Sequence, residues 1–304
     1  MIVNYEDIIM KRIFALLLAI VMVFLFSACK RESLQPPETT EQGEQSAAAD
    51  NTEQEAQSSS TDNAEQEGAA AVFTPVFSVT EVFELKHFTP PNSAGEIHYL
   101  FHEPLWKTGK DYPLVIFLHG LGDTITTSEM GSGTYLVDSL IDMENESEKY
   151  AAYTLIPITP LSGEGWWKDW QFDFLQKLIF DLVENYNIDA KRIYVTGLSM
   201  GGFTTCRLVN AMPPDTFAAA VPLSGANNLT NPDAHHNTAF RIYHVASDTT
   251  VNVESSRSLY QQLRASQHPK AEYYELTSGT HTSPMHTVYS DRLFMGWLFT
   301  QRLP

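Results

Sequence analysis

The chain has 304 residues, of which 37 are acidic, 19 are basic and 43% are apolar. That apolar share is ordinary for a globular protein and excludes a wholly disordered or fibrous chain. The net charge of −18 and the absence of a basic stripe argue against a nucleic-acid partner, because that affinity comes from neutralising phosphates. Two cysteines cannot make a disulfide framework, and no Cys/His spacing of a zinc site is present. We expect neither a metal nor a cofactor.

The first residues predict an export signal. Lys11 and Arg12 precede an apolar run over residues 13–26, which is shorter than the ~20 residues that span a bilayer. Residues 25–29 then resemble the lipobox of bacterial lipoproteins, in which the cysteine carries the lipid and becomes the mature N-terminus. We therefore expect residues 1–29 to be a lipoprotein signal peptide and Cys29 to anchor the protein outside the bacterial cell membrane. The alternatives are cleavage at another position or an uncleaved anchor with an incidental cysteine. Met10, followed directly by Lys11 and Arg12, is typical of a natural translation start.

Residues 30–72 predict a disordered acidic linker. They are mostly Glu, Gln, Ser, Thr and Ala, and residues 30–70 hold ten acids against two bases. Such a stretch buries too little apolar surface to offset the entropy of ordering it, and its like charges extend it. We expect a tether whose role is reach.

Residues 73–304 have the size of one catalytic domain. Strand-like apolar runs alternate with helical periods, which predicts an α/β fold with a mostly parallel sheet and helices on both faces. Strands are expected at residues 76–85, 95–102, 113–118, 153–157, 192–196, 217–223, 241–246 and 271–276. Helices are expected at residues 174–186, from 199 through 209, at 255–263 and at 289–301.

A candidate nucleophile lies in the motif Gly197-x-Ser199-x-Gly201. The motif alone is weak, but here a predicted strand precedes it and a predicted helix follows it. Glycines at these positions allow a turn so tight that the serine projects above the sheet at a helix N-terminus. The helix dipole and its free N–H groups then favour negative charge beside the serine.

A nucleophilic serine needs an acid and a histidine, which follow it in that order in this architecture. Asp248 comes just after the strand at 241–246, where open α/β sheets place functional groups, and Asp233 is a poorer candidate. His281 follows the strand at 271–276 and is the preferred base, with His286 as the alternative. His244 lies within a strand, where packing is the simpler expectation.

The oxyanion hole requires two backbone donors. One is expected to be the N–H of Met200, directly after the nucleophile. The second should come from the loop after the strand at 113–118, where Leu121 is preferred over Gly122. His119 precedes the serine in the chain, so we expect it to brace this loop by hydrogen bonds rather than to act as the base.

Residues 112–120, 187–202 and 217–225 resemble α/β-hydrolases. The nearest branch is the polyhydroxybutyrate-depolymerase-like and feruloyl-esterase-like group, also described as predicted peptidases of the prolyl-oligopeptidase clan. The ending, Gly279-Thr-His281 followed by Tyr289 and Trp297-Leu-Phe, is similar to that branch and favours His281 over His286. The resemblance covers essentially all of residues 73–304 and implies a serine hydrolase.

Aromatic residues follow the strand at 153–157. Trp166 and Trp167 could stack on a sugar or an aromatic acyl group, or they could pack against the following helix. Cys206, on the helix after the nucleophile, is expected to be a small buried core residue.

These observations predict a secreted, lipid-anchored serine esterase that acts through an acyl-enzyme. Its expected substrate is a small-molecule or polysaccharide ester with a short or aromatic acyl group. Two alternatives remain open, a peptidase that uses the same three residues and a non-catalytic surface binding protein.

Overall fold

The structure is a computed structural model that describes residues 82–93, 95–122, 133–159, 166 and 168–304. The expected signal peptide with Cys29, the linker and Trp167 lie outside the described residues.

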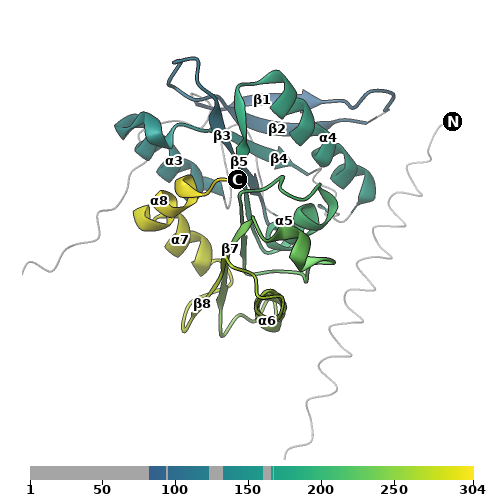
Figure 1. The fold of residues 1–304 in the computed structure, drawn as a ribbon, viewed down its shortest axis with the longest axis vertical. Helices are drawn as coiled ribbons and strands as arrows, with labels where there is room; N and C mark the ends of the chain where they lie inside the picture. The colour runs from purple at the N-terminus through teal and green to yellow at the C-terminus, as the bar shows by residue number, and fades with distance from the viewer. Residues whose placement is uncertain (1–81, 94, 123–132, 160–165, 167) are drawn as a thin grey trace, which may run out of the picture. The chain divides into compact units, whose positions relative to one another are not determined.

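An eight-stranded sheet forms the centre of the described domain, with the order β1-β2-β4-β3-β5-β6-β7-β8 (Figure 1). β1 and β2 pair antiparallel, as do β2 and β4, and every later neighbour pairs parallel. The strands are Glu84–Phe88 (β1), Ile97–His102 (β2), Tyr112–Leu118 (β3), Tyr153–Ile158 (β4), Ile188–Leu198 (β5), Ala219–Leu223 (β6), Ala239–Val245 (β7) and Ala271–Leu276 (β8). The mostly parallel sheet confirms the predicted α/β class.

Helices cover both faces of the sheet (Figure 1). The α-helices are Thr134–Glu146 (α3), Asp169–Asn185 (α4), Met200–Ala211 (α5), Glu254–Ala265 (α6), Ser283–Tyr289 (α7) and Arg292–Thr300 (α8). Short 3₁₀ helices occupy Glu148–Tyr150 (η2) and Pro232–His235 (η4). α4, α5 and α6 contribute to one core cluster, and α3, α7 and α8 contribute to a second on the opposite face.

β3 shows why a continuous apolar run makes a central strand. Leu114 and Ile116 belong to the core cluster of α4, α5 and α6, whereas Val115 and Phe117 belong to the cluster of α3, α7 and α8. Successive side chains point to opposite faces of a strand, so an alternating pattern would leave one of these two cores without apolar partners. Cys206 on α5 is fully buried in the first cluster, as predicted.

Three parts of the fold differ from the sequence prediction. The single closing helix expected at residues 289–301 is wrong, because Tyr289 ends α7 and a new helix begins at Arg292. The cause is local: the Asp291 side chain accepts the N–H of Leu293 and caps α8. Both helices pack on the same core cluster, so the apolar pattern continues across the break. The second difference is α3, which no prediction covered. The third is β1, which begins only at Glu84 and runs to Phe88, whereas the strand was expected at residues 76–85.

Candidate active site

Ser199 lies in the sharp turn between β5 and α5. Its backbone has φ 56° and ψ −114°, a conformation that is strained for a residue with a side chain. The turn is held on both sides, because the Ser199 N–H donates to the carbonyl of Leu223 at 2.8 Å and the Ser199 carbonyl accepts the N–H of Phe203 at 2.9 Å. Ser199 is only partly buried and lines a pocket of about 510 Å³.

The two motif glycines are required by the close approach of β3. A Cβ at Gly201 would lie 1.8 Å from the carbonyl oxygen of Leu118, and a Cβ at Gly197 would lie 2.5 Å from the same atom. Neither position can therefore hold a side chain without displacing the end of β3. The spacing of the motif reflects this contact as well as the turn itself.

Asp248 and His281 come together from the ends of β7 and β8. His281 Nδ1 donates to Asp248 Oδ2 at 2.6 Å, and Asp248 Oδ1 accepts the N–H groups of Thr250 at 2.8 Å and Val251 at 3.1 Å. Burial alone would raise the pKa of Asp248, but the hydrogen bond from His281 and the two backbone donors outweigh burial and lower it. Asp248 is therefore an ionised, fully buried acceptor.

The other ring nitrogen of His281, Nε2, is the candidate proton acceptor. His281 Nε2 is buried and has no hydrogen-bond partner in the described part of the chain. Because Nδ1 carries the proton that is donated to Asp248, Nε2 of the neutral ring is free to accept one. Ser199 and His281 line the same pocket, so the structure brings the three predicted residues to one place.

The backbone groups expected to bind an oxyanion line this pocket too. Met200 is the first residue of α5, so its N–H has no acceptor within the helix. Leu121 and Gly122 both line the pocket, and Leu121 is 59% exposed. His119 braces their loop as expected, because its Nδ1 donates to the carbonyl of Gly120 at 2.8 Å and its Nε2 accepts the N–H of Thr159 at 3.2 Å.

The alternative site residues lie elsewhere. His286 is exposed on α7, where its ring packs edge-on against Tyr135 with centroids 4.9 Å apart. Asp233 is exposed on η4, and its carboxylate lies 3.5 Å from His236. Neither residue lines the pocket of Ser199.

Of the two roles left open for Trp166, the structure supports a packed side chain and contradicts stacking on substrate. Its side chain is 0% exposed, and its ring packs 5.5 Å from the ring of His119, centroid to centroid. The Trp166 carbonyl accepts a hydrogen bond from Arg207 on α5 at 2.8 Å. A tryptophan so enclosed supports the loop of His119 and has no free face to offer a ligand.

Two residues near the site were not assigned a role from the sequence. Ser224 follows β6 with φ 48°, and its hydroxyl donates to the backbone carbonyl of His281 at 2.7 Å. His244 lies on β7 with its Nε2 3.2 Å from Asp248 Oδ2. The spacing of His244 and Asp248, four residues apart across a strand end, was the available signal for the second contact.

The pocket is mostly apolar. His281 is the only titratable side chain among the described residues that line it. The lining residues are Gly120, Leu121, Gly122, Leu198, Ser199, Met200, Phe203, Thr250, Val251, His281 and Thr282. Such a surface favours an uncharged group next to the serine.

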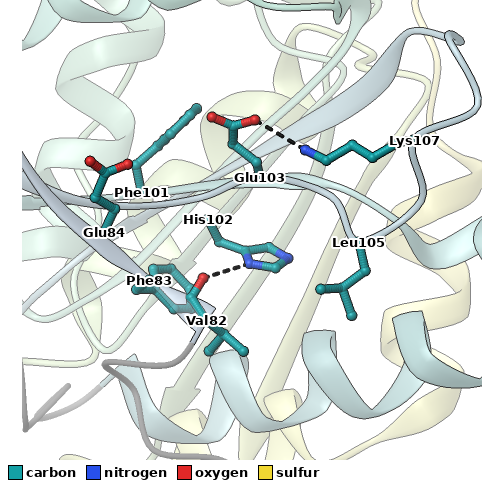
Figure 2. A pocket seen from close by; sticks show the side chains of 8 residues that line it. All are labelled: Val82, Phe83, Glu84, Phe101, His102, Glu103, Leu105 and Lys107. Atoms are coloured by element: carbon teal, nitrogen blue, oxygen red, sulfur yellow. Dashed lines mark hydrogen bonds and ion pairs between the residues drawn. The ribbon is translucent and has the colours of Figure 1, made fainter.

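A second pocket of about 420 Å³ lies beside β1 and β2 (Figure 2). None of the candidate catalytic or oxyanion-binding residues lines it. Figure 2 shows His102, whose Nδ1 donates to the carbonyl of Val82 at 2.8 Å, and the ion pair of Glu103 with Lys107 at 3.1 Å. His102 Nε2 also lies 2.8 Å from Glu144 Oε2, both side chains being buried. These polar groups have partners within the protein, so we assign this pocket no role in binding.

Neither a metal site nor a membrane span is found in the described ranges. No group of three or more His, Cys, Asp or Glu side chains there could hold a metal ion. No helix in the same ranges has the length and apolar character needed to cross a bilayer.

Comparison with known proteins agrees with this fold. Residues 161–276 match the Prolyl oligopeptidase family. The chain is 31% identical over 159 residues to poly(3-hydroxyalkanoate) depolymerase C of Paucimonas lemoignei, an alignment that covers 49% of this chain and 35% of that protein. It is 25% identical over 186 residues to the bifunctional acetylxylan esterase/xylanase XynS20E of Neocallimastix patriciarum, covering 59% and 26%. The matches thus span about a third or less of these relatives.

Solved structures share the architecture. The crystal structure of a thermostable esterase superposes with a TM-score of 0.61 at 26% identity, covering 74% of this chain and 64% of that one. The acylaminoacyl peptidase of Pyrococcus horikoshii superposes with a TM-score of 0.55 at 17% identity, covering 73% and 42%. The sheet order, the strained serine turn and these likenesses together define an α/β-hydrolase fold.

Proposed function

We propose that this α/β-hydrolase is a serine esterase. Ser199 attacks the ester carbonyl carbon, and His281 Nε2 accepts the hydroxyl proton and returns it to the departing alcohol. Asp248 holds the ring of His281 and stabilises its charged form. The N–H groups of Met200 and Leu121 stabilise the oxyanion, and water then releases the acid from the acyl-enzyme.

One observation carries the proposal. His281 Nδ1 is bonded to Asp248 Oδ2 at 2.6 Å, Nε2 has no hydrogen-bond partner among the described residues, and His281 lines the pocket that holds the strained Ser199. A serine presented by a strained turn in the same pocket as an oriented imidazole suits nucleophilic acyl transfer.

A fluorophosphonate probe tests this function directly. The full chain should be labelled, and Ser199→Ala should abolish the label while Ser283→Ala, which changes a serine on α7, should keep it. An unlabelled wild type would favour a non-catalytic binding protein instead.

The proposed substrate is an ester of a short or aromatic acyl group on a carbohydrate. The apolar pocket supports an uncharged acyl group, and one relative is named an acetylxylan esterase. The other is named a poly(3-hydroxyalkanoate) depolymerase, so a polyester is the main competitor. Methyl ferulate, acetylated xylan, p-nitrophenyl esters of increasing length and a polyhydroxybutyrate suspension distinguish them. A preference for acyl chains of about twelve carbons or more, or for the polymer, would overturn the proposed carbohydrate-ester substrate. The shape of the pocket determines which acyl groups are accepted.

A peptidase is the second candidate, supported by the match of residues 161–276 to the Prolyl oligopeptidase family. Peptidases and esterases of this chemistry share the same three residues, so only the leaving group separates them. Turnover of prolyl-p-nitroanilide above that of p-nitrophenyl acetate would favour the peptidase.

The proposed location is the outer side of a bacterial cell membrane, with lipid on Cys29. The basic and apolar segments before Cys29 support this, together with small residues at the expected cleavage site. Labelled palmitate should enter the wild type and not Cys29→Ala, and label that persists in the variant would contradict the anchor.

A further inference from the structure

His244 lies directly behind the candidate acid. It is 0% exposed near the end of β7, and its Nε2 lies 3.2 Å from both Asp248 Oδ2 and the carbonyl oxygen of Val251. On the other side of the ring, Nδ1 lies 2.7 Å from the hydroxyl of Ser256 on α6. Every polar atom of this ring therefore has a partner.

These neighbours determine where the proton of His244 resides. Nε2 faces a carbonyl and a carboxylate, which only accept, so Nε2 carries the proton. Nδ1 then accepts from the Ser256 hydroxyl. Burial lowers the pKa of His244, so the ring is neutral and needs no second proton for these contacts.

We propose that His244 is a positioning residue that holds Asp248 in register with His281. The proposal rests on the esterase function above. Asp248 Oδ2 receives the proton of His281 Nδ1 and faces the Nε2–H of His244. His244 also binds the carbonyl of Val251, whose own N–H donates to Asp248 Oδ1. One ring thus holds both the carboxylate and the turn that cradles it.

The chemical consequence concerns the charge on Asp248. A donor near Oδ2 spreads the carboxylate charge, so the carboxylate stabilises the protonated form of His281 less strongly. Without that donor, the carboxylate should stabilise the charged ring of His281 more strongly. The other charged groups here are Glu275, in register with His244 on β8, and Arg257 of α6, which pairs with Glu275 at 2.6 Å.

Two substitutions of matched chemistry test the role. In His244→Gln the amide nitrogen can reach as far as Nε2, whereas in His244→Asn it is one methylene short. We expect the Asn variant of the full chain to lose about fivefold to tenfold in kcat with KM within about twofold. The acid limb of its kcat/KM profile should move up by about half a pH unit, and the Gln variant should stay near wild type in both. Equal effects of Asn and Gln, or an unmoved limb in the Asn variant, would overturn the proposal.

An NMR measurement tests the role of His244 separately from the proposed esterase activity. The imidazole titration of His281 can be followed without turnover, so an enzyme inactive on all esters would refute the esterase alone. A charged ring of His281 that persists to higher pH in the Asn variant than in the wild type would still support His244. Should that variant fail to fold, ¹⁵N shifts of the wild type decide: a neutral His244 with the proton on Nε2 supports the role, and any other form refutes it.

Discussion

The hydroxyl of Ser224 donates to the backbone carbonyl of His281 at 2.7 Å, which ties the end of β6 to the loop that carries the proposed base. β7 lies between the two strands concerned, so this bond crosses a neighbour that itself supplies Asp248. Ser224 is fully buried and is fixed in turn, because its N–H donates to the carbonyl of Tyr243 at 2.9 Å. The base is therefore oriented through its main chain as well as through its ring.

Ser224→Ala should lower kcat about tenfold and the free energy of unfolding by about 1 kcal/mol, because the carbonyl of His281 loses its donor. Ser224→Gly removes the same hydroxyl but relieves the positive φ of 48°. The Gly variant should hence recover stability without recovering kcat. Steady-state kinetics and urea unfolding of both variants check this, and a Gly variant with wild-type kcat would show that strain, not the bond, matters.

Ser199→Ala and His281→Ala should each reduce kcat by about 10⁴-fold or more, because residues that act as one unit fail together. The fold should persist in both, since neither side chain is part of the apolar core. His286→Ala is the matched control and should keep wild-type rates. A His281→Ala enzyme that stays active while His286→Ala fails would reverse the assignment of the base.

Trp166→Ala should lower the free energy of unfolding by about 3–5 kcal/mol, the usual cost of deleting a buried aromatic side chain. Trp170→Ala, at a tryptophan that is 45% exposed, should cost far less. Thermal melts of the two variants provide the comparison. An unchanged melting temperature and a raised KM in Trp166→Ala would instead support direct contact between Trp166 and the substrate.

Three histidines should make the protein less stable as the pH falls. Burial lowers the pKa of His235, His244 and His268, so the unfolded chain binds protons near pH 6.5 that the native state does not. Stability is then lost as the pH falls below the unfolded value, by up to ~1.4 kcal/mol per pH unit for each proton. Urea unfolding at pH 7.5, 6.0 and 5.0 should show the decline.

The control for this pH dependence is a pair of substitutions. His268→Gln removes one buried group and should flatten the decline, whereas His87→Gln changes an exposed histidine and should leave it unaltered. A decline of the same steepness in all three proteins would show that other groups control the pH response.

Residues 30–72 should be dispensable for chemistry. A chain that begins at Ala71 should retain kcat within about twofold, because a tether supplies reach and no part of the site. Hydrolysis of p-nitrophenyl acetate by the shortened and full chains provides the test. A large loss of kcat would mean that the linker contributes to the pocket.

The sequence was most informative where backbone crowding dictates residue type. Gly197 and Gly201 must lack side chains beside Leu118, so their spacing, together with the strand before and the helix after it, located Ser199. β3 was predicted correctly for a similar reason, because a strand with a core on each face needs an apolar residue at every position.

Other features depend on contacts that a linear pattern does not contain. Asp291 divides the closing helix by one side-chain bond to Leu293, and the apolar pattern around it stays helical. The sequence left Trp166 open between stacking and packing, because its packing partner His119 is far away in the chain. His244 was expected to pack, and packing alone gives no hint of the carboxylate beside it.

The contact of Gly201 with the carbonyl of Leu118 couples two parts of the machinery that are remote in sequence. The serine turn rests on the last residue of β3, and the loop with Leu121 starts immediately afterwards. The attacking oxygen and one proposed oxyanion donor therefore share a single mechanical support. Substitutions at Thr250, Val251 and Thr282 can change the substrate range because these residues line the pocket. A change at the contact between Gly201 and Leu118 would disturb the nucleophile and the oxyanion donor together.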